Sequence, residues 1–180
     1  RLNWVGAFAP GMRGGRRAHP PKAEKIWWQE LNKKERRKSL RSAIAASMMK
    51  EIVAQRGHKV PPAFPFILDS SIEDMQKTRM ILDFLRITGF SDELARSKVK
   101  KVRAGKGKAR ARKYKKKKGI LFVVGKDCSL LRAARNIPGT DVCIVEDINT
   151  ELLAPGGAPG RVTLWTTAAI EKMEKGRLFL

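Results

Sequence analysis

The side chains of this 180-residue sequence that could perform acid–base or metal chemistry are four carboxylates and two histidines: Asp127, Asp141, Glu146, Asp147, His19 and His58. The carboxylates stand beside the ends of predicted strands, where α/β proteins usually form their sites. Each also has an ordinary role: Asp127 as a helix cap, Asp141 in a turn, and Glu146 and Asp147 as polar residues that end a strand. No nucleophile motif or set of metal ligands accompanies them. We therefore predict no catalytic residue and no enzyme activity.

Nucleotide-binding and metal-binding motifs are also missing. Gly125-Lys126 follows a predicted strand, but the pattern GxxxxGK[ST] is absent, and no GxGxxG follows a strand. Cys128 and Cys143 form no CxxC pair and lie in or beside apolar runs, which favours buried free thiols. We predict no metal site and no cofactor. His58, directly after Gly57, is interpreted as a residue at the C-terminus of a helix.

Positive charge is concentrated in two segments. Residues 1–41 hold 12 basic and 3 acidic side chains, and residues 98–119 hold 13 basic and no acidic ones. The other 117 residues are balanced, so the two segments account for the whole net charge of +22. Such blocks repel themselves unless a polyanion neutralises them. Because the second block lacks the bulky apolar face that a membrane surface requires, the pattern favours nucleic acid as the partner and argues against a membrane.

The first 21 residues combine Gly, Ala, Pro and Arg with two aromatic residues, Trp4 and Phe8, and show no helical or strand period. Gly14-Gly15 is typical of irregular structure. Arginines in such a segment can pair with phosphates and stack on bases, and His19 is interpreted as an RNA contact. We predict an RNA-binding arm that is disordered in the free protein; a merely flexible terminus is the alternative.

A long amphipathic helix is predicted over residues 32–57, because Leu40, Ile44, Met48 and Ile52 recur at every fourth position. Basic residues crowd its first turns, where positive charge opposes the helix macrodipole. This placement indicates that an external anion compensates the charge, although a solvated helix face is the simpler alternative.

The next elements are shorter. Residues 65–68 are predicted to be extended, and Ser91 is predicted to cap a short helix that reaches Leu94. A helix from Thr78 that stops at Gly89 is expected to bury four apolar side chains: Met80, Ile81, Phe84 and Leu85.

Beyond residue 119 the pattern alternates between strands and helices. The predicted elements are a strand at 120–124, a helix at 129–136, a strand at 142–145, a helical piece at 149–153, a strand at 162–165, and a final helix that opens at Thr166 or Thr167. Alternation with short connections predicts a parallel sheet with right-handed crossovers, covered on both faces. The fold class is therefore α/β: a three-layer domain with a small parallel sheet flanked by helices, plus extended basic RNA-binding segments.

Four strings in register resemble one family. They are GGRRAHPPK at 14–22, NKKERR at 32–37, VRAGKGK at 102–108, and LLAPG at 152–156 with PGR at 159–161. Their order and spacing resemble the fourth protein of the large ribosomal subunit (universal ribosomal protein L-four) in its archaeal form, from about Phe8 to Ile170. Residues 1–12 match less well, and Trp27-Trp28 and Cys128 are not typical of the family.

The resemblance implies an α/β globular domain and a long loop that reaches through ribosomal RNA to the nascent-peptide exit tunnel. Residues 1–25 would be the returning half of that loop, with Trp4, Phe8, Met12 and Arg13 near the tunnel. The first strand and the outgoing half of the loop are expected upstream, and the stop at Leu180 favours an archaeal source. Residues 26–180 would be the globular domain, with a basic RNA-binding insertion at about 98–119.

The expected RNA-binding residues come from three segments: Arg13, Arg16, Arg17, His19, Lys22, Lys33, Lys34, Arg36, Arg37, Arg103, Lys106, Lys108, Arg110, Arg112, Lys113, Tyr114, Lys115 and Lys116.

The function expected from the resemblance is that of a structural constituent of the cytoplasmic large ribosomal subunit, present once per ribosome. Its partners would be large-subunit ribosomal RNA, neighbouring large-subunit proteins and, transiently, the nascent peptide. The main alternative is an RNA-processing enzyme with basic arms that uses Asp127, Asp141 and Asp147 with a divalent metal. A DNA-packaging protein is a third possibility.

Overall fold

The structure is a computed structural model, and it describes residues 9–179. The chain forms two compact units, Arg1–Asn32 and Lys33–Leu180. In the first unit, residues 9–32 contain turns and bends but no helix or strand, as the aperiodic composition predicts. In the part of the chain that the structure describes, no helix is long and apolar enough to cross a membrane.

The second unit is built on a sheet of four parallel strands. In spatial order these are β1 (Ile67–Leu68), β6 (Thr163–Thr166), β4 (Leu121–Val124) and β5 (Asp141–Ile144). The central strand β4 pairs Leu121 with Asp141 on one side and with Thr163 on the other. All four side chains of β4 and of β6 are buried, which is the burial expected when both sheet faces are covered. The predicted parallel α/β sheet is confirmed.

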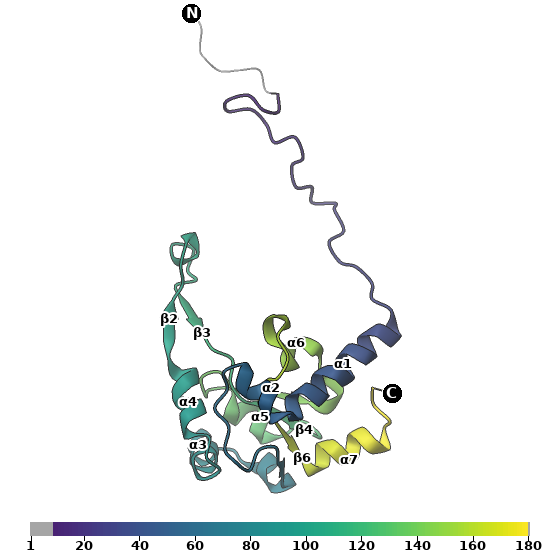
Figure 1. The fold of residues 1–180 in the computed structure, drawn as a ribbon, viewed down its shortest axis with the longest axis vertical. Helices are drawn as coiled ribbons and strands as arrows, with labels where there is room; N and C mark the ends of the chain where they lie inside the picture. The colour runs from purple at the N-terminus through teal and green to yellow at the C-terminus, as the bar shows by residue number, and fades with distance from the viewer. Residues whose placement is uncertain (1–8, 180) are drawn as a thin grey trace, which may run out of the picture. The chain divides into compact units, whose positions relative to one another are not determined.

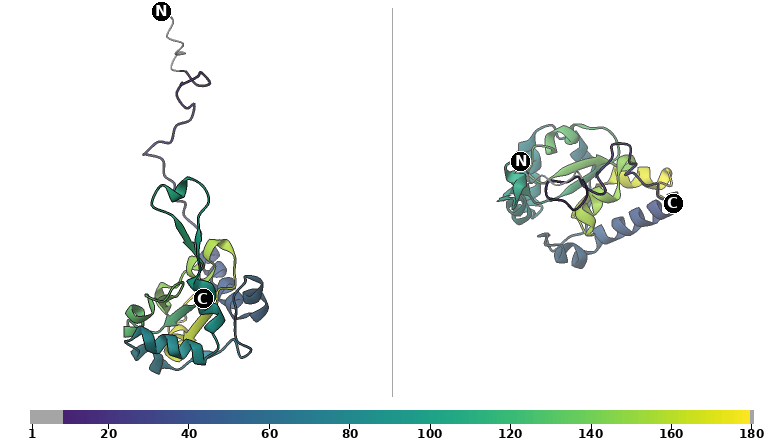
Figure 2. Two further views of the ribbon diagram at one scale, coloured as in Figure 1. Left: turned by 90° about the vertical axis from the view of Figure 1, so that its left-hand side faces the viewer. Right: turned by 90° about the horizontal axis from the view of Figure 1, so that it is seen from above.

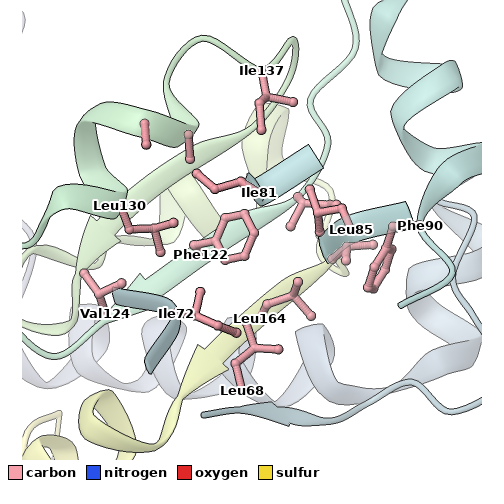
Figure 3. Packing of buried hydrophobic residues seen from close by; sticks show 14 of the residues in the cluster. Leu68, Ile72, Ile81, Leu85, Phe90, Phe122, Val124, Leu130, Ile137 and Leu164 are labelled. Atoms are coloured by element: carbon pink, nitrogen blue, oxygen red, sulfur yellow. The ribbon is translucent and has the colours of Figure 1, made fainter. Parts of the chain in front are cut away.

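Helices cover both faces and make three layers. Phe122 and Val124 point into a cluster with the helices α3 (Thr78–Ile87) and α5 (Ser129–Ala134), as Figure 3 shows. Leu121 and Val123 point to the opposite face. There they meet residues of α1 (Lys33–Met48), α6 (Thr150–Leu153) and α7 (Thr167–Lys175). Because neighbouring strand residues alternate between faces, one apolar run supplies both cores.

The prediction of a single helix over residues 32–57 is wrong. The chain forms two helices there, α1 and α2 (Lys50–Gln55). Met49 separates them with an extended backbone (φ −83°, ψ 108°) and a largely exposed side chain. Leu40 of α1 packs in the cluster on one sheet face, whereas Val53 of α2 packs in the cluster on the other. A straight helix could not place both side chains, so the chain changes direction between them.

The helix predicted from Thr78 to Gly89 is α3, and its core residues Ile81 and Leu85 are fully buried. Met80 was expected in the core, but its side chain is about half exposed because it lies on the solvent side of the helix. A 3-10 turn, η1 (Ser70–Asp74), precedes α3. The next helix, α4 (Ser91–Lys98), extends one turn past the predicted end at Leu94.

Side-chain caps begin the last two helices. Asn149 Oδ1 accepts a hydrogen bond from the Leu152 N–H (2.8 Å) at the start of α6, and Thr166 Oγ1 accepts one from the Ala169 N–H (3.2 Å) at the start of α7. The predicted cap at Asp127 is wrong: Cys128 occupies the N-cap position of α5 without a side-chain bond, and Asp127 is exposed. Two 3-10 turns, η3 (Val145–Asp147) and η4 (Pro155–Gly157), complete the connections.

The helix α3 provides a matched test of the core. Leu85→Ala should lower the free energy of unfolding by about 2–5 kcal/mol, because it removes a fully buried side chain and leaves a cavity. Ile87→Ala, on the same helix at 86% exposure, should change it by less than about 1 kcal/mol. Urea unfolding followed by tryptophan fluorescence measures both. Equal losses would contradict the placement of Leu85 in the core.

Candidate nucleic-acid interface

The basic block forms a two-stranded antiparallel hairpin, an element that the sequence pattern did not predict. Its strands are β2 (Lys100–Val102) and β3 (Tyr114–Lys116), with a 3-10 turn, η2 (Lys106–Lys108), near the tip. In Figures 1 and 2 it projects from the α4 side of the globular domain. Val102 lies opposite Tyr114, and a β-branched residue paired with an aromatic one favours sheet formation.

Lysines lie directly opposite lysines in this hairpin. Lys100 pairs with Lys116, and Lys101 pairs with Lys115. Like charges at facing positions destabilise a strand pair, and residues 98–119 contain no acidic side chain that could relieve them. The hairpin is therefore a structure whose stability increases when phosphate groups lie between or beside its lysines.

The tip of the hairpin is shaped by its backbone. Arg103 N–H donates to the Lys113 carbonyl (2.8 Å), and Arg112 N–H donates to the Gly107 carbonyl (3.0 Å). Gly105 has a φ of +80°, a conformation that residues with a Cβ rarely adopt. Because backbone groups hold the turn, the basic side chains remain exposed at the surface: Arg103, Lys106, Lys108, Arg110 and Arg112.

A buried arginine fixes the base of the hairpin to the sheet. The Arg161 side chain is fully buried and donates to the carbonyl oxygens of Gly119 (2.8 Å) and Leu152 (2.9 Å) and to the Asp141 carboxylate. Lys118, the last lysine of the basic block, also donates to Asp141 (2.8 Å). Burial raises the pKa of Asp141, but the hydrogen bonds from Lys118 and Arg161 lower it by more, so the net pKa lies below the ordinary value.

The connection between the basic block and β4 is also close-packed. Gly119 N–H donates to the Gly139 carbonyl (2.8 Å). Gly139 has a φ of +80°, and a Cβ there would come within 2.8 Å of the Lys117 carbonyl oxygen. The chain entering β4 from the hairpin and the chain entering β5 are thus held against each other.

A second buried ionic cluster joins α4 to the base of the hairpin at Lys118. The Glu93 carboxylate contacts His58 Nδ1 (2.7 Å), accepts from the Lys59 N–H (3.0 Å) and is paired with Arg96. Arg96 also donates to the Lys118 carbonyl (2.7 Å). Sequence reasoning missed this cluster, and it interpreted His58 only as a helix end. The spacing of Glu93 and Arg96 on one helix face was the available signal.

The first turns of α1 carry further basic residues, and all of them are exposed: Lys33, Lys34, Arg36, Arg37 and Lys38. Positive charge at a helix N-terminus is unfavourable, and Glu35 is the acidic residue in that turn. Arg36 and Arg37 line a cavity of about 380 Å³ together with Glu146 and Asp147, so this basic group has acidic neighbours that the hairpin lacks.

In the first unit the predicted arm residues are all exposed: Met12, Arg13, Arg16, Arg17, His19 and Lys22. Trp4 and Phe8, predicted for the tunnel, lie outside the described residues. The neighbouring Trp27 and Trp28 are 72% and 74% exposed, and Lys25 Nζ lies 4.6 Å from the centre of the Trp27 ring. The structure therefore offers flat aromatic surfaces next to cations in this segment.

Asp141 is kept apart from the other carboxylates weighed for catalysis. Asp141 begins β5 and Asp147 follows its carboxyl end, so the strand separates them by about 10 Å or more. The prediction that Asp141 lies in a turn is wrong: it is the first residue of β5 and pairs with Arg161. Within residues 9–179 no group of three or more His, Cys, Asp or Glu side chains could hold a metal ion.

The cysteines are free, as predicted. Cys143 is buried and Cys128 partly buried. Burial raises the pKa of Cys143 to about 12 and raises that of Cys128 as well, so both remain thiols at neutral pH. Neither thiol is activated as a nucleophile.

The Glu93 cluster predicts a pH dependence of stability. Burial raises the pKa of Glu93, but hydrogen bonds from Arg96, His58 and the Lys59 N–H lower it by more. The net pKa is thus lowered from 4.5, so its stabilisation is present above pH 4.5 and is lost as pH falls through the folded-state value. Glu93→Gln should destabilise the protein by about 3–5 kcal/mol at pH 7, because it leaves the largely buried guanidinium of Arg96 without its ionic partner.

Urea unfolding between pH 7 and pH 3 measures this effect. The variant should lose less additional stability on acidification than the wild type. Asp92→Asn, an exposed neighbour on α4, should keep the wild-type profile. An unchanged profile in Glu93→Gln would contradict the role assigned to Glu93.

Comparison with known proteins identifies the family. Residues 1–176 match the model of the ribosomal protein L4/L1 family. Three archaeal proteins named large ribosomal subunit protein uL4 are similar over nearly the whole chain. That of Methanocaldococcus jannaschii is 49% identical over 171 residues, that of Archaeoglobus fulgidus 47% over 172, and that of Methanococcoides burtonii 48% over 169.

These alignments cover 94%, 95% and 93% of this chain and 68%, 68% and 67% of the respective relatives. The resemblance predicted from the four sequence strings is confirmed, including its archaeal type. The chain belongs to the ribosomal protein L4/L1 family.

Proposed function

We propose that the chain is a structural constituent of the cytoplasmic large ribosomal subunit and that its two basic segments bind large-subunit ribosomal RNA. The observation that carries the proposal is the lysine-on-lysine pairing of the hairpin, where Lys100 faces Lys116 and Lys101 faces Lys115. The hairpin carries 13 positive charges and no negative one over residues 98–119. Phosphates are the partners that relieve this repulsion, and the counterions that they release drive binding.

Binding and folding are divided between parts of the chain. The sheet and its helices form two cores, while the net charge resides in segments outside them. The globular domain would act as a rigid platform, and the hairpin and the start of α1 would contact phosphates. In this proposal the RNA-binding residues of the second unit are those predicted from the sequence: Lys33, Lys34, Arg36, Arg37, Arg103, Lys106, Lys108, Arg110, Arg112, Lys113, Tyr114, Lys115 and Lys116.

Residues 1–25 would act as an extended arm that contacts RNA through Arg13, Arg16, Arg17, His19 and Lys22. Their exposure and their small neighbours support close approach to RNA. In this proposal Met12 and Arg13, together with Trp4 and Phe8, would lie at the exit tunnel and meet the nascent peptide. One copy per ribosome, in contact with neighbouring large-subunit proteins, completes the proposal.

An RNA-processing enzyme is disfavoured by the positions of the carboxylates. A two-metal or metal–water mechanism requires carboxylates that share an ion. Asp127 and Asp147 lie at the carboxyl edge of the sheet, whereas Asp141 lies at the amino edge and is already paired with Arg161 and Lys118. Binding without catalysis is therefore the function that we propose.

The proposal predicts that RNA affinity and stability can be separated. Changing Arg16, Arg17, Arg103 and Lys106 to Gln together should reduce the slope of log Kd against log salt by about 3, since each lost phosphate contact removes about 0.7–0.9. The melting temperature should not fall, because all four side chains are exposed. Filter binding to purified large-subunit RNA over a salt series, with parallel thermal melts, measures both quantities.

A matched control removes charge from helices instead. Arg79 on α3 and Lys175 on α7 are exposed and paired with Asp83 and Glu171. Their change to Gln should leave the salt slope unchanged. A parallel loss of affinity and stability in the first variant would contradict the division between binding and folding.

Assembly into the subunit needs a separate test. The endogenous protein should co-sediment with the large subunit through a high-salt sucrose gradient, in equal amount to its RNA. Recovery mainly in the light fractions would overturn the ribosomal assignment.

A further inference from the structure

The two faces of the β2–β3 hairpin differ in chemistry. Side chains of a strand alternate between faces, and facing residues of an antiparallel pair share a face. The register places Val102 and Tyr114 on one face, next to Lys100 and Lys116, whereas Lys101 and Lys115 lie on the other. One face is thus partly apolar and aromatic, and the other presents lysines.

The apolar pair is open to solvent. Val102 and Tyr114 are each 50% exposed, although paired hydrophobic residues at a domain surface are usually packed against another element. Tyr114 is the only tyrosine of the chain and the only aromatic residue between Phe90 and Phe122. Two ammonium groups lie near its ring, with Lys100 Nζ 5.8 Å and Lys113 Nζ 5.5 Å from the ring centre.

We propose that the hairpin binds RNA with both faces. The Val102–Tyr114 face stacks against an unpaired base, and the Lys101–Lys115 face neutralises phosphates. The inference rests on the proposed function, since it divides the RNA-binding surface of the hairpin into two parts. A nucleotide combines a flat base with a phosphate, and the Tyr114 ring flanked by Lys100 and Lys113 offers a complement to each.

The structure favours RNA over a protein as the occupant of this face. A partner protein would cover an apolar patch with apolar residues, but only Val102 and Tyr114 are apolar within the two strands, and lysines surround them. An interface core depleted of charge is the usual requirement for protein association. Base stacking needs only one exposed ring beside cations, which is the arrangement present here.

Contacts at the base of the hairpin fix the orientation of the Val102–Tyr114 face. The Lys118 side chain and the Lys118 carbonyl are held by Asp141 and Arg96, and Gly119 is held by Arg161. These contacts restrict rotation of the strands about their connection to β4. A ring presented on a held ribbon loses less freedom on binding than a ring on a flexible tail.

The test compares Tyr114→Leu, Tyr114→Phe and Lys101→Gln in the full chain. The probes are a fluorescein-labelled RNA hairpin with an unpaired loop and a fully paired RNA of equal length, with affinity measured by fluorescence anisotropy over a salt series. Tyr114→Leu should weaken binding to the looped RNA about 5- to 150-fold, the range for loss of one base stack, without changing the salt slope. Tyr114→Phe should bind like the wild type.

The other face should respond differently. Lys101→Gln should reduce the salt slope by about 0.7–0.9 on both RNAs, because a phosphate contact is lost irrespective of base pairing. Circular dichroism and thermal melts should match the wild type for all three variants. A Tyr114→Trp variant, which keeps a ring, should recover the affinity that Tyr114→Leu loses.

The outcomes separate the two proposals. Salt-insensitive or absent binding by the wild-type chain would overturn the proposed function itself. Wild-type binding with no effect of Tyr114→Leu, or an equal effect on looped and paired RNA, would overturn base stacking alone. If Tyr114→Leu binds RNA normally but fails to enter the large subunit, the face contacts a protein instead.

Discussion

The buried guanidinium of Arg161 holds together the edge of the sheet from which the basic hairpin emerges. It donates to the carbonyl oxygen of Gly119, just before β4, to that of Leu152 in α6, and to the carboxylate of Asp141 at the start of β5, so three connections meet at one side chain. A buried charge is costly unless its donors are satisfied, and here the donors face carbonyl and carboxylate oxygens of chain segments that enter or precede the strands. If the cation is removed, these oxygens lose their partner, and the strand entrances lose their common anchor. The orientation of the hairpin therefore depends on an interaction inside the fold.

Two ionic clusters, around Asp141 and Glu93, lie at the base of the hairpin and differ from the hairpin itself in having acidic partners. Asp141 and Glu93 are acidic groups that take up the nearest cations, Lys118, Arg161 and Arg96, and both have lowered pKa values because of these partners. Beyond Lys118, toward the tip of the hairpin, no carboxylate remains in the basic block to pair with the lysines. The boundary between paired and unrelieved cations thus falls at about Lys118. Arg96, Lys118 and Arg161 are paired within the fold, whereas the facing lysines of the hairpin repel one another, a repulsion that the proposed RNA partner would relieve.

Much of the fold could be predicted from the sequence because it depends on local patterns. The apolar run at 120–124 and its counterparts at 142–145 and 162–165 were sufficient for a parallel sheet, and the side chains of Asn149 and Thr166 marked helix starts. The features that the sequence did not predict depend on contacts between residues distant in the chain. His58 and Glu93 are 35 residues apart, and nothing near either predicts that they meet. The break at Met49 follows from Leu40 and Val53 serving different cores, which periodicity alone does not reveal.

The hairpin was missed for a different reason, and the same reason explains its function. Strand prediction relies on alternation of apolar and polar residues, and in Lys100–Val102 and Tyr114–Lys116 lysines occupy four of the six positions. The only apolar pair, Val102 with Tyr114, is too short to register as a strand. A ribbon built to contact phosphate, as we propose for this one, gives up the apolar face that would make it recognisable and stable alone. Its fold is held at the base by Arg161 and Arg96, and in the proposed function a polyanion would relieve the charge along its length.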